Sequence, residues 1–276
     1  MVARARPAKS KKKPLLASHQ RSWLWGRNLV QETIAGGRWR IHELYLADDV
    51  VAEATACLAQ VQASGLKPTR ASRTRLTQLC GAQDHQGYVA RVGEYPYVTV
   101  EALRAEARAP VLWLILDGVQ DPFNLGAMLR SAEVFGVDGV FLGAQGQAGV
   151  NSLAARSSAG AVNRLGIARV ENLSSLIGVL RREAVVRVVG TSVDGDYALD
   201  ACDLTGPSAL VIGNEATGLS PEVAAACNML AKIPQAGALN SLNAAAAAAV
   251  CLYEVQRQRR QDVSMWGVPA SPSRAP

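Results

Sequence analysis

The sequence predicts an α/β protein in which a small N-terminal α/β module precedes a larger part built on a mainly parallel sheet. From residue 110 onward, short apolar runs alternate with helix-like segments, a pattern typical of parallel strands joined by crossover helices. Residues 23–97 also alternate strand-like and helix-like patterns, over a length that suits a small module of their own.

The expected elements follow from these patterns. The strands of the larger part are expected at Val111–Leu116, Gly139–Leu142, Val185–Val189, Ala209–Ile212 and Leu230–Ile233. Its helices are expected at 125–136, 151–159, 171–183, 221–227 and 242–259. In the smaller part we expect strands at Ile41–Leu46 and Gly87–Val92 and helices at 50–63 and Ser72–Leu79. Residues 98–109, rich in Ala, Glu and Arg, are expected to link the two parts.

The positive charge is concentrated at the N-terminus. The net charge is +6, but seven basic residues and no acidic one lie in residues 1–22. The rest of the chain is therefore close to neutral. We expect residues 1–22 to be a disordered tail that helps to bind RNA phosphates. Residues 261–276, with several prolines and serines, are expected to form a second disordered tail.

Composition also excludes several classes of protein. The chain lacks a run of about 18 apolar residues, which argues against a membrane span, and its basic N-terminus lacks the apolar stretch of a secretion signal. Five scattered cysteines and three histidines show no zinc-ligand spacing. We therefore expect a cytoplasmic protein with buried, reduced cysteines and no metal site.

Two polar segments follow expected strands at the sheet edge where open α/β proteins bind ligands. The first contains Asn124 and Arg130. Asn124 is expected to cap a helix, whose free N-terminal amides suit a phosphate. The second contains Gly213, Asn214 and Glu215. Gly213 permits a flat ligand to approach the backbone closely, whereas a partly buried Glu215 needs a partner, for which Arg130 is the candidate.

A third segment follows the strand Leu230–Ile233. After a loop, Ser241, Leu242 and Asn243 open a helix that begins with six consecutive alanines, at 244–249. Because alanine adds little bulk, this helix offers a smooth surface that another backbone or helix can approach closely. The sequence thus places polar groups after three separate strands of one expected sheet.

The order, spacing and flanking strands of these three segments resemble the signature motifs of the SpoU (TrmH) family, the RNA ribose 2′-O-methyltransferases of the SPOUT class. The resemblance covers about residues 23–260 and is to the branch typified by the bacterial RlmB 23S rRNA guanosine methyltransferases. It implies a SPOUT domain with a deep trefoil knot at 110–260, preceded by an RNA-binding domain at 23–97. The sequence departs from the family at Ala244 and Ala245, where Val-Ser is usual.

The resemblance also implies an activity and a set of site residues. The cofactor would be S-adenosylmethionine, and the methyl acceptor a ribose 2′-hydroxyl in RNA, most simply of a 23S rRNA guanosine. Substrate binding and catalysis would use Asn124, Arg130, Glu215, Ser241 and Asn243. Cofactor contacts would come from Thr191, Ile212, Gly213, Asn214, Gly218, Ile233 and Leu242. The family forms homodimers in which each site borrows residues from the neighbouring subunit.

The role of Arg130 allows two interpretations. The family proposal makes it the base, but a guanidinium with a pKa above ~12 is a poor base. Orienting the 2′-hydroxyl and balancing phosphate charge is the alternative.

Residues 23–97 resemble the substrate-binding domain of the same family, including the segment from His85 to Ala90. Arg70, Arg73 and Arg75 are expected to contact RNA phosphates, although on a helix face they would equally suit a solvated surface. Gln86 and Gly87 either contact RNA or only form a tight turn into the following strand.

The sequence fits other classes of enzyme less well. The first expected strand lacks the G-x-G-x-x-G turn of nicotinamide enzymes, and no P-loop is present. All three histidines lie outside the larger part, which disfavours a serine hydrolase. Two alternatives stay open: a non-catalytic RNA-binding or ribosome-assembly protein on the same fold, and an enzyme acting on tRNA or on an antibiotic-resistance site of rRNA.

Overall fold

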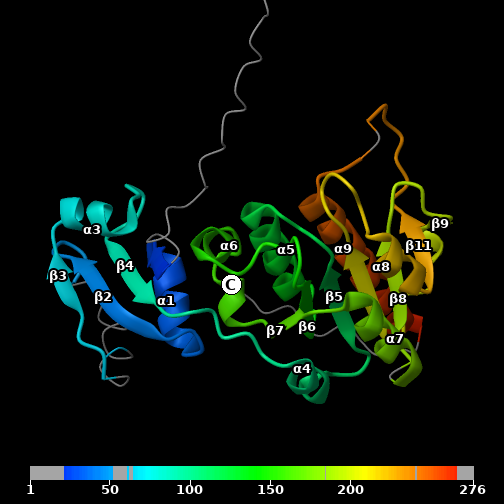
Figure 1. The fold of residues 1–276 in the computed structure, drawn as a ribbon, viewed down its shortest axis with the longest axis horizontal. Coiled ribbons are helices and arrows are strands. Elements are labelled where there is room, and N and C mark those ends of the chain that lie inside the picture. The colour runs from blue at the N-terminus through cyan, green and yellow to red at the C-terminus, as the bar shows by residue number, and fades with distance from the viewer. Residues whose placement is uncertain (1–21, 52–60, 62–64, 184, 240, 266–276) are drawn as a thin grey trace, which may run out of the picture.

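The computed structural model describes residues 22–51, 61, 65–183, 185–239 and 241–265, and shows two lobes, each built on its own sheet (Figure 1). The smaller lobe contains a four-stranded sheet with the order β1-β4-β2-β3. The larger lobe contains a seven-stranded parallel sheet with the order β7-β6-β5-β10-β8-β11-β9. The predicted α/β class, with a mainly parallel sheet after a small α/β module, is confirmed.

Among the residues that the structure describes, the smaller lobe packs helices α1 and α3 against a mixed sheet. Its elements are β1 (Trp23–Trp25), α1 (Arg27–Gly36), β2 (Ile41–Ala47), β3 (Thr69–Ala71), α3 (Arg73–Cys80) and β4 (Tyr88–Val92). Strand β4 runs antiparallel to β1 and β2, and β3 runs parallel to β2. The patterns missed β1 and β3, which have only three residues each. Most of the predicted helix at 50–63 and residues 1–21 of the predicted tail at 1–22 lie outside the described residues.

The larger lobe alternates strands and helices along the chain. Its helices are α4 (Val100–Glu106), α5 (Pro122–Val134), α6 (Ser152–Ser157), α7 (Leu173–Glu183), α8 (Pro221–Ala226) and α9 (Ala244–Met265), with short 3₁₀ turns η2 (Ala161–Asn163) and η3 (Leu199–Ala201). Its strands are β5 (Leu112–Leu116), β6 (Gly139–Gly143), β7 (Ile167–Val170), β8 (Arg187–Thr191), β9 (Tyr197–Ala198), β10 (Ser208–Ile212) and β11 (Met229–Lys232).

The structure differs from the predicted elements at three places in this lobe. Strand β7 was not predicted because it is short and exposes Arg169 in mid-strand, and β9 has only two residues. Helix α9 continues to residue 265, so the predicted C-terminal tail at 261–276 begins inside a helix. No glycine or proline precedes Gly267 there, and nothing stops the helix earlier. Residues 266–276 lie outside the described part.

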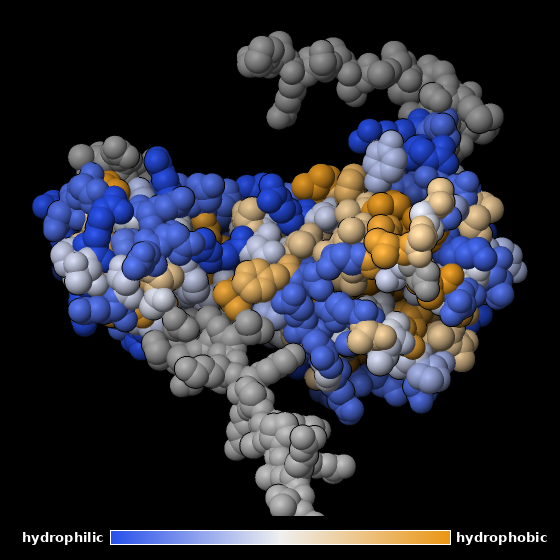
Figure 2. Space-filling model, turned by 90° about the horizontal axis from the view of Figure 1, so that it is seen from above, coloured by the Kyte–Doolittle hydropathy of each residue, from blue (hydrophilic) through white to orange (hydrophobic). Residues whose placement is uncertain are grey.

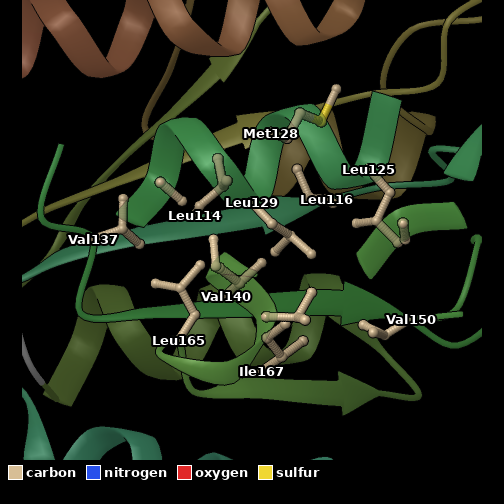
Figure 3. Packing of buried hydrophobic residues seen from close by; sticks show 14 of the residues in the cluster. Leu114, Leu116, Leu125, Met128, Leu129, Val137, Val140, Val150, Leu165 and Ile167 are labelled. Carbon is tan, nitrogen blue, oxygen red and sulfur yellow. The ribbon is translucent and has the colours of Figure 1, made fainter. Parts of the chain in front are cut away.

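The core of the larger lobe fixes the place of α5, the helix that carries Asn124 and Arg130. Leu125 and Leu129 of α5 belong to the same buried hydrophobic cluster as Leu114 and Leu116 of β5 (Figure 3). On another face, α5 lies so close to α6 that a Cβ on Gly126 would be 2.3 Å from the carbonyl oxygen of Ala154. A side chain at Gly126 would therefore push the two helices apart, so glycine is needed at this crossing.

The segment between the lobes is packed rather than free. Val98 donates its backbone N–H to the carbonyl of Ile167 at 2.9 Å. Leu103 of α4 is buried, and a Cβ on Gly166 would be 2.3 Å from its side chain. The expected linker at 98–109 thus packs against the larger lobe. Threading of the chain into a trefoil knot, which the family resemblance implies, stays a prediction.

Candidate active site

A pocket of about 500 Å³ lies at the carboxyl ends of β8, β10 and β11. All seven residues predicted to contact a cofactor line this single pocket: Thr191, Ile212, Gly213, Asn214, Gly218, Ile233 and Leu242. Ser241 lines it as well. The two charged side chains among its lining residues, Asp194 and Glu215, are both acidic. The pocket therefore combines apolar and small lining residues with two acidic side chains, which suits a ligand that carries positive charge.

The turn after β10 depends on Gly213 and Asn214. A Cβ on Gly213 would be 2.3 Å from the carbonyl carbon of Gly218, so glycine is needed where the turn closes on itself. Asn214 and Gly218 exchange backbone hydrogen bonds of 2.9 and 3.0 Å. The side chain of Asn214 donates to the carbonyl of Gly118 at 2.7 Å and accepts from the backbone N–H of Ala216 at 2.8 Å. Asn214 therefore ties this turn to the loop after β5.

Three of the predicted catalytic residues form one chain of hydrogen bonds. Asn243 donates its side-chain N–H to Asn124 Oδ1 at 3.0 Å, and Asn124 Nδ2 donates to Glu215 Oε1 at 3.0 Å. Glu215 also accepts the backbone N–H groups of Gln120 and Asp121, at 3.2 and 3.3 Å. The three segments, far apart in the sequence, thus meet at one edge of the sheet.

The environment of Glu215 keeps its carboxylate charged. Partial desolvation raises its pKa, but the donor groups of Asn124, Gln120 and Asp121 outweigh that effect and hold the pKa below the ordinary value. An ionised carboxylate only accepts hydrogen bonds. Its charge therefore fixes the direction of the chain: the amide of Asn124 must donate to Glu215 and turn its oxygen toward Asn243.

Three of the predictions for these residues are wrong. The N-cap of α5 is Asp121, which accepts the N–H of Phe123 at 2.9 Å with Pro122 in the first position, so Asn124 lies inside the first turn. Proline fixes the first helical residue, which places the cap before it. Glu215 is exposed rather than partly buried, and its donors are Asn124 and two amides instead of Arg130.

Arg130 lies apart from this network. Its side chain is exposed on α5, and it is absent from the lining of the pocket. Within the described part of the chain, its guanidinium has no hydrogen bond or ion pair. The structure thus brings together Asn124, Glu215, Ser241 and Asn243 and leaves Arg130 outside the group.

Two further residues hold the site loops, and the predicted set omitted both. Asp117 accepts the backbone N–H of Ser220 at 2.7 Å, which joins the loop after β5 to the start of α8. Gln147 accepts the N–H of Val119 at 3.0 Å from the opposite side. Asp117 directly follows a strand and was detectable by that signal. Gln147 was not, because it lies in a polar loop whose contact depends on the tertiary fold.

In the smaller lobe, the segment at His85 forms a tight turn. His85 Nδ1 accepts the N–H of Gly87 at 3.0 Å, and Gln86 Oε1 accepts the N–H of Arg27 at the start of α1. Gly87 has φ of +83°, and a Cβ there would be 2.9 Å from Val50. These contacts favour the turn interpretation of Gln86 and Gly87 over direct contact with RNA.

The three arginines proposed for RNA binding are all exposed. Arg70 lies on the edge strand β3, and Arg73 and Arg75 lie in the first turn of α3. Arg73 forms an ion pair with Asp49 at 2.6 Å, so part of its charge is already balanced. Arg70 and Arg75 are the stronger candidates for phosphate contact. Figure 2 shows that this lobe is mainly hydrophilic on the face seen from above, while hydrophobic side chains gather on the larger lobe.

Two possible features are absent from the described residues. None of the helices there combines the length and apolar character that a membrane span requires. The same residues contain no group of three or more His, Cys, Asp or Glu side chains placed to bind a metal ion.

The larger lobe is an open parallel sheet with a pocket built from the loops at its strand ends. This arrangement defines a ligand-binding α/β protein. Comparisons with known proteins then show its family. The model described as SpoU rRNA methylase family matches residues 111–253, and that described as RNA 2′-O ribose methyltransferase substrate binding matches residues 23–98. The chain belongs to the SpoU family of RNA 2′-O-ribose methyltransferases.

Individual relatives agree with this assignment. The chain is 38% identical to the 23S rRNA (guanosine-2′-O-)-methyltransferase RlmB of Coxiella burnetii, over 86% of this chain and 95% of that protein. Among solved structures, it resembles the SpoU methyltransferase AviRb of Streptomyces viridochromogenes in complex with AdoMet, with a TM-score of 0.75 and 29% identity over 86% and 90% of the two chains. It also resembles the AdoMet-bound rRNA methyltransferase of Sinorhizobium meliloti, with a TM-score of 0.73 and 29% identity over 85% and 86%.

Proposed function

We propose that the chain binds S-adenosylmethionine in the pocket at the ends of β8, β10 and β11 and methylates the ribose 2′-hydroxyl of a guanosine in 23S rRNA. The observation that carries this proposal is the meeting of the three segments at one edge of the sheet. Seven predicted cofactor contacts line one pocket there, and the Asn243–Asn124–Glu215 chain borders it. The RlmB relative and the AdoMet-bound structures support the same substrate and cofactor.

The pocket fits the chemical character of this cofactor. Ile212, Ile233 and Leu242 offer apolar contact to an adenine ring, and the turn from Gly213 to Leu219 lines the same pocket. The acidic side chains of Asp194 and Glu215 complement a ligand whose sulfonium and ammonium groups are positive. When bound, the cofactor supplies an electrophilic methyl group.

Catalysis then rests mainly on positioning. A ribose hydroxyl must be held in line with the methyl group and must lose one proton. The amides of Asn124 and Asn243 are oriented by the charged Glu215, so they present fixed polar groups beside the pocket. We assign to Arg130 the orientation of the 2′-hydroxyl and the balancing of a substrate phosphate.

We further propose a homodimer through α5 and α9. Both helices carry apolar side chains that are unusually exposed: Phe123 (49%), Val134 (66%), Val250 (40%) and Tyr253 (55%). Helical spacing puts Arg130 on the same stripe of α5 as Phe123 and Val134. Since Arg130 does not line the pocket of its own chain, the proposed dimer would let it serve the pocket of the partner subunit.

The dimer predicts a mass by light scattering of twice the 29.2 kDa chain at micromolar concentration. Tyr253→Asp should give a monomer, because a carboxylate would be desolvated at the interface. Tyr197→Asp, at an equally exposed aromatic residue on the edge strand β9, is the matched control and should remain dimeric. A wild-type mass of a single chain would refute the dimer.

The choice of 23S rRNA over tRNA rests on the smaller lobe, which the short tRNA-modifying branch of the family usually lacks. Mapping 2′-O-methyl groups in rRNA and tRNA from a strain without the gene tests it. We expect one guanosine of 23S rRNA to lose its mark and to regain it when purified protein and S-adenosylmethionine are added. A mark lost only from tRNA would move the chain to the tRNA-modifying branch. A cytoplasmic location suits this substrate, and Cys202, Cys227 and Cys251 are buried free thiols.

A further inference from the structure

The segment from Ser152 to Leu165, which contains α6 and η2, forms the junction between the two lobes. In Figure 1, α6 lies between α1 of the smaller lobe and α5 of the larger lobe. One face of the segment packs against α5, where Gly126 permits close contact with Ala154. Its other face contacts β1, α1 and Tyr95. The junction therefore connects the RNA-binding lobe to the helix that carries Asn124 and Arg130.

Three buried hydrogen bonds cross this junction. Ser152 Oγ donates to the carbonyl of Trp23 at 2.6 Å, and Asn163 Nδ2 donates to Thr33 Oγ1 at 3.1 Å. The hydroxyl of Tyr95 donates to the carbonyl of Val162 at 2.7 Å. Separating the lobes would break these bonds and leave the donors and acceptors without partners until water reached them, which costs free energy. The bonds therefore favour one docked arrangement.

Charged and apolar contacts surround these bonds. Arg156 pairs with Asp84 at 2.6 Å and lies over the ring of Trp25, and Arg164 pairs with Glu32 at 2.8 Å. One continuous hydrophobic cluster includes Leu29, Val30 and Trp39 from the smaller lobe and Ala161, Val162 and Leu165 from the junction. Domains joined by a small polar contact are expected to move relative to one another. A shared apolar core with buried hydrogen bonds instead holds the two lobes in one arrangement.

We propose that the two lobes work as one rigid body, with residues 152–165 as the positioning element that sets the RNA-binding lobe relative to the catalytic edge. This inference rests on the proposed function. It deepens that proposal by defining the substrate class. The substrate would be an RNA whose own fold holds the part bound by the smaller lobe and the target ribose at a fixed separation. A flexible RNA strand would lose the entropic advantage of a preformed enzyme surface.

A disulfide across the junction tests whether the docked arrangement is the working one. A Cβ on Gly36 would be 3.1 Å from Cβ of Asn163, slightly shorter than the roughly 3.5–4.5 Å of a disulfide, so Gly36→Cys with Asn163→Cys should form a bond after a small shift. Thr33 keeps its own hydrogen bond to the carbonyl of Leu29. The oxidised full-length protein should methylate 23S rRNA with a kcat/KM within about twofold of its reduced form.

The opposite result would overturn the proposal. A loss of about tenfold or more on oxidation, recovered on reduction, would mean that the lobes must separate during the reaction. Each single cysteine variant and the wild type, with and without reductant, are the controls. Binding of S-adenosylmethionine should be equal in both redox forms. A wild type without methylation would instead refute the proposed function.

A loosened junction provides a second test that needs no disulfide. Arg156→Glu with Arg164→Glu reverses the charges that face Asp84 and Glu32. The KM for 23S rRNA should rise by about fivefold or more, while kcat and the Kd of S-adenosylmethionine stay within about twofold. Adding Asp84→Arg and Glu32→Arg should restore the KM, which a loss of general stability would not explain. A wild-type KM in the loosened variant would contradict the positioning role.

Discussion

Replacing Gly213 by alanine is expected to remove most of the binding of S-adenosylmethionine. The added Cβ would lie 2.3 Å from the carbonyl carbon of Gly218 and 2.4 Å from the nitrogen of Leu219. Both are backbone atoms, which cannot rotate away as a side chain can. The turn must open, and every residue from 213 to 219 lines the pocket. We expect the Kd to rise about a hundredfold, equivalent to about 2.7 kcal/mol.

A matched glycine shows whether this effect is local. Gly206 has open space where its Cβ would be added, so Gly206→Ala should bind the cofactor with wild-type affinity. Calorimetry gives the Kd of the cofactor, and the thermal unfolding midpoint shows whether the variant is still folded. Together they distinguish a distorted pocket from an unfolded protein. If Gly213→Ala binds as tightly as the wild type, the cofactor does not depend on this turn.

The fold was predictable from the sequence where the elements were long and strongly patterned. Runs such as Ala209–Ile212 are apolar throughout because the strand is buried on both faces, and that signal does not depend on the rest of the chain. Strand β7 was missed since Arg169 interrupts its apolar character. The packing of the segment after residue 98 was also missed, because it depends on Leu103 meeting Gly139 and Gly166.

The candidate site was predictable as a set of residues and less so as a set of contacts. Polar residues placed directly after strands identified the three segments, since parallel strands bring their carboxyl ends to one edge. Their partners were not predictable from spacing. Glu215 has several donors within reach, and only the path of the loop after β5 decides that Asn124 and two amides reach it while Arg130 does not.

Replacing Arg130 by alanine is expected to lower methyl transfer by about a hundredfold or more, in the range found when one group that stabilises transition-state charge is removed. The Kd of S-adenosylmethionine should stay unchanged, because Arg130 does not line the pocket. Arg130→Lys should lose most activity as well, since an ammonium lacks the planar fork of the guanidinium. Arg182→Ala, at another exposed arginine on α7, is the control and should keep full activity.

Mixing two inactive variants decides which pocket Arg130 serves. In the proposed dimer, a subunit with Arg130→Ala keeps a normal pocket, and its partner with Gly213→Ala keeps a normal Arg130. If Arg130 reaches across the interface, each mixed dimer contains one complete site of two. Random pairing makes about half of the co-expressed dimers mixed, so co-expression should recover about a quarter of the wild-type activity. If Arg130 serves its own subunit, both sites are defective and the mixture stays inactive. Full activity of Arg130→Ala alone would remove the residue from the mechanism altogether.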